Sequence, residues 1–221
     1  MSIKENLSNI KSELPESVTL VAVTKTKPVS DIMEAYETGH RDFGENKVQE
    51  MVEKAEKLPN DIRWHMIGHV QRNKVKYMAD FVHLIHGVDS LKLLKEINKR
   101  AKSVDRVIGC LLQIKIAEED SKFGMSSEDA KILLESEAYR KFTNIKLMGV
   151  MGMATFTDDE EQVSKEFRRL ALIFEELKSN YNLGPEFKEI SMGMSGDYNI
   201  AITEGSTMVR IGSSIFGERN Y

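Results

Sequence analysis

Short apolar runs alternate with longer segments of helical periodicity along the whole chain. About eight runs have the length of a strand, and each ends at a glycine or a cluster of polar residues. Several are apolar at consecutive positions, as in VIGCLLQI, which is typical of strands buried on both faces of a parallel sheet. The predicted strands are Thr19–Thr24, Arg41–Gly44, Trp64–Ile67, Phe81–Val88, Val107–Ile116, Lys146–Met153, Phe187–Met192 and Met208–Ile211.

The segments between these runs have the spacing of amphipathic helices. In the clearest, apolar residues from Val163 to Leu177 recur at intervals of four and three, behind the capping-box pattern Thr157–Glu160. Further helices are expected to begin at Ser90 and Ser126. Strands and helices that alternate in this way predict a parallel sheet covered by helices. About eight such units in 221 residues predict a closed (β/α)8 barrel of the TIM type.

The composition narrows the class of protein. With four prolines, no Ser/Gly tract and no block of like charges, the chain has no candidate linker, so we expect a single domain over residues 1–221. A net charge of −4 is not typical of a nucleic-acid-binding domain. No apolar stretch approaches the roughly 20 residues that span a bilayer, and the polar start has no signal core. We expect a cytoplasmic monomer that binds neither nucleic acid nor membrane, with Cys110 as a buried apolar side chain.

One lysine stands at the end of the first predicted strand. Active sites of parallel barrels lie at the carboxyl ends of the strands, so the side chain of Lys25 can point into the barrel mouth. A surface lysine with a solvated head is the simplest interpretation. The alternative is an amine that forms a Schiff base with a carbonyl compound.

The loops after the seventh and eighth predicted strands carry phosphate-binding chemistry. They read SMGMSGDYNIA and VRIGSSIFG, at the place where barrels often hold a phosphate. In the first, Ser195 supplies a hydroxyl between Gly193 and Gly196, and in the second Gly212–Ser214 repeats that chemistry. Either loop alone could be an ordinary turn. Together with Lys25 they indicate pyridoxal phosphate (PLP), with its aldehyde on the lysine and its phosphate in the loops.

Arg210 lies in the eighth predicted strand, two residues before Gly212. An inward arginine in a barrel needs an acceptor, because a buried unpaired guanidinium is costly. The ring nitrogen of PLP is one such acceptor, and an arginine there leaves the ring unprotonated and a weaker electron sink. A salt bridge with Glu204 or Glu218 is the alternative.

Five motifs together resemble the pyridoxal phosphate homeostasis proteins, in order and over nearly the whole chain. They are VAVTKTKP, FGENKVQE, WHMIGHVQRNK, SMGMSGD and GSTMVRIGSSIFGERNY. The resemblance implies a single barrel similar to the N-terminal domain of alanine racemase, with PLP on the first-strand lysine. It also implies phosphate contacts at Ser195, Gly212 and Ser213, and a ring-nitrogen contact at Arg210. The implied cofactor-binding residues are Lys25, Asn46, Ser195, Arg210, Gly212 and Ser213.

Other polar segments have less definite meanings. The segment DSKFG also resembles the family and would place Lys122 near the mouth. His65 and His69 have a spacing that binds zinc on a helix, but a glycine intervenes, so we expect no metal and a hydrogen bond from His65 near the pocket. His86 is expected to be structural. The basic run Arg72–Lys76 is either a helix surface or a rim that attracts anions.

Two classes of function remain open. One is a PLP-dependent amino-acid racemase or related enzyme, and the other is a carrier and buffer for intracellular PLP homeostasis that passes the cofactor to apo-enzymes. In alanine racemases a second base, a tyrosine, comes from a second domain of a partner chain. Here the sequence stops ten residues after Ile211, which predicts no such domain. We therefore expect a carrier without catalytic residues.

Overall fold

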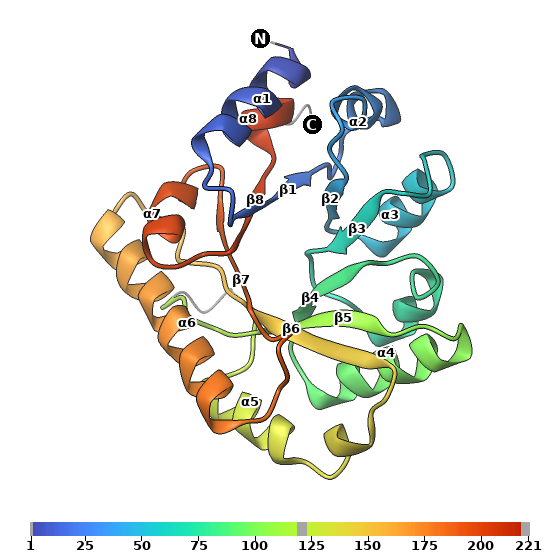
Figure 1. Cartoon of the computed structure of the whole chain (residues 1–221), viewed down its shortest axis with the longest axis vertical. Helices are drawn as coiled ribbons and strands as arrows, with labels where there is room; N and C mark the ends of the chain where they lie inside the picture. The colour runs from blue at the N-terminus through green and yellow to red at the C-terminus, as the bar shows by residue number, and fades with distance from the viewer. Residues whose placement is uncertain (1, 119–122, 218–221) are drawn as a thin grey trace.

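The computed structural model describes residues 2–118 and 123–217. In these residues eight parallel strands close into a barrel in chain order, and β1 pairs with β8 (Figure 1). The predicted (β/α)8 barrel is therefore confirmed. The strands are β1 (Thr19–Val23), β2 (Asp42–Glu45), β3 (Arg63–Met66), β4 (Leu84–Val88), β5 (Ile108–Gln113), β6 (Ile145–Met151), β7 (Glu189–Met194) and β8 (Met208–Ile211).

Helices connect the strands and surround the barrel (Figure 1). The α-helices are α1 (Ile3–Glu13), α2 (Val29–Tyr36), α3 (Val48–Ala55), α4 (Leu91–Ser103), α5 (Ser127–Glu135), α6 (Glu160–Asn180), α7 (Tyr198–Thr203) and α8 (Ser213–Phe216). Two 3-10 helices, η1 (Arg72–Tyr77) and η2 (Tyr139–Lys141), complete the described elements. No helix in this part of the chain is both long and apolar enough to cross a membrane.

Helix starts follow local capping chemistry. Ser90 and Ser126 cap α4 and α5 as expected, each accepting a backbone amide hydrogen bond with its side chain. The expected capping box at Thr157–Glu160 is wrong by two residues, because Asp159 caps α6. The Thr157 hydroxyl instead accepts the amide of Asp159 at 3.2 Å. Thr157 and Asp159 are both suitable cap residues, and the sequence alone does not show which of them caps the helix.

Strand ends are less well marked in the sequence than strand positions. The expected strand Val107–Ile116 shortens to Ile108–Gln113 in the structure. Ile114 and Ile116 stay buried after the strand has ended, and Ile114 forms an isolated bridge with Met125. The apolar run therefore predicts which residues are buried but not where the strand ends, because burial continues into the loop after β5.

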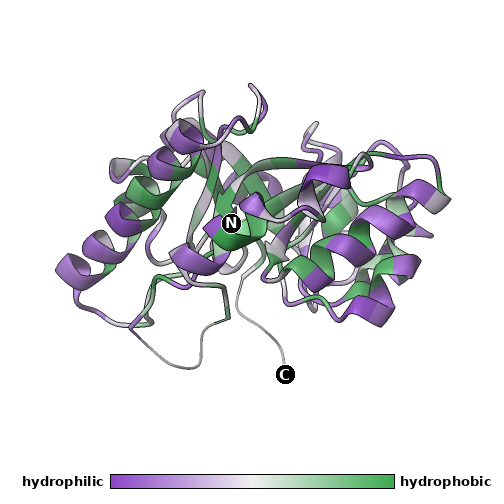
Figure 2. Cartoon of the chain, turned by 90° about the horizontal axis from the view of Figure 1, so that it is seen from below, coloured by the Kyte–Doolittle hydropathy of each residue, from purple (hydrophilic) through white to green (hydrophobic). Residues whose placement is uncertain are grey.

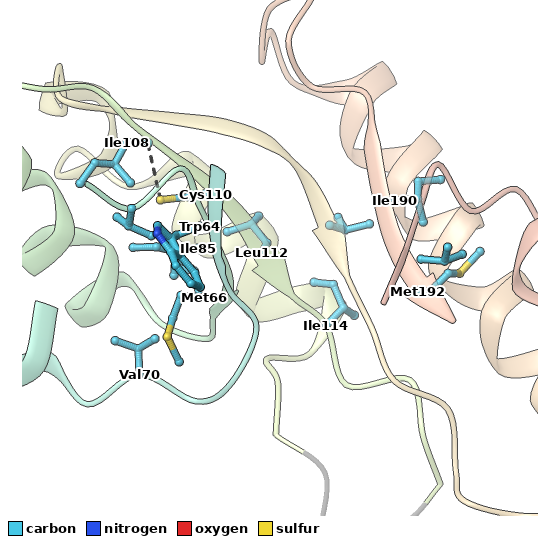
Figure 3. Close-up of a cluster of buried hydrophobic side chains, with 14 of the residues drawn as sticks. Trp64, Met66, Val70, Ile85, Ile108, Cys110, Leu112, Ile114, Ile190 and Met192 are labelled. Carbon is cyan, nitrogen blue, oxygen red and sulfur yellow. Dashed lines mark hydrogen bonds between the residues drawn. The ribbon is translucent and has the colours of Figure 1, made fainter. Parts of the chain in front are cut away.

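The main core lies between the strands and the helices. Figure 2 shows that the helices turn hydrophobic residues toward the strands and hydrophilic ones outward. Part of this core appears in Figure 3, where Trp64, Ile85 and Cys110 lie together. Cys110 is fully buried, and burial raises the pKa of its thiol, so it behaves as the expected apolar side chain.

A second, smaller set of side chains fills the inside of the barrel. Its apolar members alternate along their strands with residues of the main core, so they point inward. They are Val21, Leu84, Leu111, Met151 and Met208. The same alternation turns Asp42, His65, His86, Ser191 and Arg210 inward, so the barrel interior carries a polar layer as well.

Candidate functional site

A cavity of about 590 Å³ opens at the carboxyl ends of the strands. All six residues predicted to bind a cofactor line it, namely Lys25, Asn46, Ser195, Arg210, Gly212 and Ser213. They come from the ends of β1, β2, β7 and β8, which lie far apart in the sequence and meet at this mouth. Their contacts with a cofactor stay a prediction.

Lys25 lies two residues after the end of β1, and its side chain is half-buried at the cavity wall. The next residue, Thr26, has a φ of 65°, a left-handed conformation that is rare for a β-branched residue. Its amide donates to Glu50 Oε1 at 2.6 Å. Backbone strain of this kind persists only where surrounding contacts hold it, and here they hold the residue next to Lys25.

A buried ion cluster lies behind this turn. The Lys54 Nζ donates at 2.7 Å to the carbonyl of Thr24, to Glu45 Oε1 and to Glu50 Oε1. The Thr24 hydroxyl also donates to Glu45 Oε1, at 2.5 Å. Burial raises the pKa of Glu45, and the contacts with Lys54 oppose that shift. These four residues, the Lys54 cluster, join α3 to the ends of β1 and β2 and support the segment that carries Lys25.

The loops after β7 and β8 are joined at the proposed phosphate position. The Gly212 amide donates to Ser195 Oγ at 3.2 Å, so the two loops meet at this hydroxyl. A Cβ on Gly196 would meet no atom within 4 Å, which leaves open space beside the loop. Ser213 is the exposed first residue of α8, where backbone amides have no partner within the helix. Hydroxyls and free amides on two sides of one space suit a phosphate.

Arg210 reaches the cavity from below and is 4% exposed. Its Nη1 donates to Ser191 Oγ at 2.6 Å, and its Nη2 donates to the carbonyl of Gly152 at 3.1 Å. Burial lowers the pKa of the guanidinium to about 10, which leaves it protonated at neutral pH. The guanidinium has five N–H donors and no acceptor. It therefore offers hydrogens to an acceptor in the cavity.

The sequence offered Glu204 and Glu218 as alternative salt-bridge partners of Arg210. Glu204 pairs with Arg168 on the surface at 2.8 Å, so the alternative of a pair between Glu204 and Arg210 is wrong. Glu218 lies outside the described residues. Within residues 2–118 and 123–217, Arg210 forms no ion pair.

Asn46 lies at the cavity wall directly after β2 and is half-buried. A Cβ on Gly68 would stand 2.3 Å from its carbonyl oxygen, so the loops after β2 and β3 touch there. The side-chain amide of Asn46 makes no hydrogen bond with any described residue. It can therefore face a ligand with both a donor and an acceptor.

A continuous line of hydrogen bonds runs beneath the cavity through the barrel interior. From Arg210 it passes to Ser191, from Ser191 Oγ to His86 Nδ1 at 2.9 Å, and from His86 Nε2 to His65 Nδ1 at 3.0 Å. The His65 Nε2 then contacts Asp42 Oδ1 at 3.1 Å. We call these five residues the inner polar network. All five are at most 9% exposed.

His65 and His69 lie at different levels of the barrel, His65 in its interior and His69 at its mouth. His65 does not line the cavity, because its position in β3 points it into the barrel interior, and it reaches the mouth only through the inner polar network. His69 does line the cavity, where its ring stacks on Phe123 at a centroid distance of 4.7 Å. No group of three or more His, Cys, Asp or Glu suited to a metal occurs among the described residues. Lys122 lies outside them.

The basic run Arg72–Lys76 forms η1 and is not part of the mouth. Arg72 instead lines a larger, separate hollow of about 980 Å³, whose other residues come from α4 and the segment around η2. Of the two interpretations, a helix surface and an anion-attracting rim, the structure therefore favours the helix surface.

Comparison with known proteins shows the family of this chain. The family model of the alanine racemase N-terminal domain matches residues 1–220. A pyridoxal phosphate homeostasis protein of Vibrio alginolyticus is 39% identical over 235 residues, which cover 100% of this chain and 99% of the relative. This chain belongs to the family of pyridoxal phosphate homeostasis proteins. PipY of Synechococcus elongatus PCC7942, solved with PLP bound, has a TM-score of 0.89 at 32% identity, covering 98% of this chain and 100% of that one.

The barrel is shared more widely than the family. An alanine racemase of Clostridium difficile 630 has a TM-score of 0.81 at 16% identity, covering 100% of this chain and 57% of that one. This likeness concerns the fold alone. The predicted resemblance to the N-terminal domain of alanine racemase is thereby confirmed for the barrel.

Two parts of this family member's site were missed by reasoning from its sequence. Glu45 and Lys54 carry a weak signal, because each is a charged residue at a position where the apolar pattern predicts burial. His65 and His86 each alternate with apolar neighbours, which predicts a shared face but not a partner. Both sets depend on contacts between distant strands.

Proposed function

We propose that this chain binds PLP in the mouth cavity, as a Schiff base on Lys25, and serves intracellular PLP homeostasis as a carrier and buffer. The observation that carries the proposal is that Lys25, Arg210 and the joined loops of Ser195 and Gly212 face one cavity. When bound, PLP supplies an aldehyde and a ring that accepts electrons. The naming of relatives as pyridoxal phosphate homeostasis proteins, and PLP in the PipY structure, support it.

The donor set fits this cofactor in kind. The hydroxyls of Ser195 and Ser213 and the amides at the start of α8 would hold the phosphate. The guanidinium of Arg210 would donate to the ring nitrogen, because it has only N–H groups to offer. Asn46 would meet a polar edge of the ring. These groups bind and orient the ring so that its aldehyde meets the amine of Lys25.

A carrier is favoured over a racemase by the open rim of the cavity. Racemisation needs a proton donor on each face of a substrate that is held away from water. Because Ser213 and Phe156 at the rim are exposed, the site is open to exchange with an incoming recipient. We further propose that the chain is a single domain over residues 1–221 and a cytoplasmic monomer. It would pass PLP to recipient apo-enzymes and bind neither nucleic acid nor membrane.

Reduction of the loaded protein with borohydride tests the attachment. We expect purified protein to absorb at the edge of the visible range and, after reduction and digestion, to carry the pyridoxyl group on Lys25. Lys25→Ala should lose both signals while keeping its far-ultraviolet circular dichroism, since this side chain faces a cavity.

Lys27→Ala is the matched control, because Lys27 lines the same cavity and bonds the carbonyl of Phe216 at 2.7 Å. It should keep the label on Lys25. A pyridoxyl group on Lys27 or another lysine, with Lys25 unmodified, contradicts the assignment.

A further inference from the structure

The inner polar network joins two ends of opposite chemistry. At the mouth is Arg210, which can only donate hydrogen bonds, and at the base is Asp42, whose carboxylate can only accept them. Between them every contact is 2.6 to 3.1 Å long, within hydrogen-bonding range. When the two ends are fixed and both histidines are neutral, the position of each hydrogen between them follows.

The direction of each hydrogen bond can be assigned from the mouth downward. Ser191 Oγ accepts from Arg210, so its single O–H is available for His86 Nδ1. A His86 ring that accepts at Nδ1 carries its hydrogen on Nε2 and donates it to His65 Nδ1. His65 in turn carries its hydrogen on Nε2 and donates it to Asp42. One arrangement, with two neutral histidines, satisfies all four contacts.

The charges around the network support this arrangement. Burial lowers the pKa of His86 well below its usual value, and the nearby Arg210 guanidinium acts in the same direction. Burial alone would raise the pKa of Asp42, but hydrogen bonds from His65 and Arg63 outweigh it and lower that pKa. The ring of His83 lies 5.4 Å from that of His65 and has a pKa lowered to about 4, chiefly by burial.

A protonated network would have a different connectivity. If His65 held hydrogens on both nitrogens, it would donate to His86 Nε2. His86 would then donate from Nδ1 to Ser191, whose oxygen would accept from two sides. The Ser191 hydrogen would have to leave its present partner, and the donors around Arg210 would be rearranged. A change in the protonation of His65 would therefore change the hydrogen bond between the Ser191 hydroxyl and Arg210 at the mouth.

We propose that Asp42, His65, His86 and Ser191 are positioning residues, which fix the orientation of the Arg210 guanidinium toward the ring nitrogen of the bound cofactor. This inference rests on the proposed function, since it concerns the ligand that Arg210 faces. Ser191 holds one N–H of the guanidinium, and the histidine pair holds Ser191. The buried layer thus keeps the ring nitrogen hydrogen-bonded and unprotonated, although none of these four residues lines the cavity.

A first test needs no cofactor. Nitrogen-15 NMR of the imidazoles in the unloaded protein should show neutral rings with the hydrogen on Nε2 for both His65 and His86. A hydrogen on Nδ1 of His86, or a charged His86 at neutral pH, overturns the directional arrangement.

A second test uses the loaded protein and its absorbance as a function of pH. His86→Leu removes both contacts of the ring, and we expect the apparent pKa of the Lys25 Schiff base to shift by about one unit, a tenfold change in that equilibrium. His86→Asn, which keeps an acceptor for Ser191, should restore most of the wild-type titration. If His86→Leu does not fold, Ser191→Ala removes the same contact to Arg210 and should give the shift.

Leu84→Ala is the matched control, because Leu84 is 1% exposed, points inward from the same strand beside His65, and has no polar atom that could join the hydrogen bonds of the network. It should lower the melting temperature and leave the absorbance titration unchanged. Wild-type titrations in His86→Leu and Ser191→Ala, with the pyridoxyl group still trapped on Lys25, overturn the positioning role alone. Failure to trap any group on wild-type Lys25 overturns the proposed function instead.

Discussion

Single hydroxyl groups decide how the proposed phosphate is held. Ser195 already bonds the amide of Gly212, and Ser213 stands at the start of α8. A hydrogen bond to a charged group contributes about 1.5–3 kcal/mol. Because 1.4 kcal/mol is about tenfold in affinity, Ser195→Ala should weaken PLP binding roughly 10- to 100-fold. Equilibrium titration followed by absorbance measures the change.

The neighbouring serine provides the comparison. Ser214 is exposed like Ser213 but does not line the cavity, so Ser214→Ala should bind PLP as the wild type does. Unchanged affinity in the double variant Ser195→Ala, Ser213→Ala would exclude this phosphate site.

At the scale of elements, the Lys54 cluster connects α3 to β1 and β2. The side chains of Lys54 and Glu45 are 8% and 0% exposed. Removing one partner of a buried pair leaves an uncompensated charge, so Lys54→Met should lower the free energy of unfolding by about 3–5 kcal/mol near neutral pH. Urea unfolding measures the loss. Lys57→Met, an exposed neighbour, should change it by less than about 0.5 kcal/mol.

The sign of the pH dependence follows from Glu45. Burial raises its pKa in the folded state, so ionising this carboxyl opposes folding at higher pH, and that opposition disappears as pH falls through the folded-state pKa. Lys54→Met removes the opposing cation and raises this pKa further. The deficit of the variant should therefore shrink as the pH is lowered from neutral. A deficit that grows on acidification would contradict this account.

Local sequence signals predicted the helices and strands. The partners of buried polar residues could not be predicted, because they depend on contacts between distant strands. The serines that begin α4 and α5 are readable because a cap bonds amides two or three residues away. Lys25 and the loops after β7 and β8 were readable because strand ends of a parallel barrel share one mouth. The pairing of His65 with His86 depends on the register of β3 against β4, which neither strand specifies alone.

For the whole molecule, the carrier proposal predicts no sustained turnover of amino acids. The exposed rim admits water, which weakens charge stabilisation in the cavity, and under the proposed binding mode the buried arginine would keep the ring unprotonated. General acid–base catalysis contributes about 10²–10⁴-fold, so a carrier that lacks one of the two bases of a racemase should show only a trace rate. Deuterium incorporation at Cα of L-alanine and L-serine, followed with loaded protein, checks this.

An alanine racemase run in parallel sets the scale of this measurement. Exchange of order 1 s⁻¹, the low end of typical enzymes, that disappears in Lys25→Ala would place the protein among the enzymes. Transfer of PLP to an apo-enzyme faster than free release would support the carrier.

Closure of the barrel by β1 and β8 has a consequence for the nascent chain. Lys25 leaves the ribosome early and Arg210 late, because they follow or belong to the first and last strands. The amine of Lys25 is therefore synthesised before the loops after β7 and β8. During nearly all of translation β1 has no β8 with which to pair. A polypeptide cut short by premature termination could not retain the proposed cofactor. Aborted synthesis would leave PLP free instead of trapping it on a partial barrel.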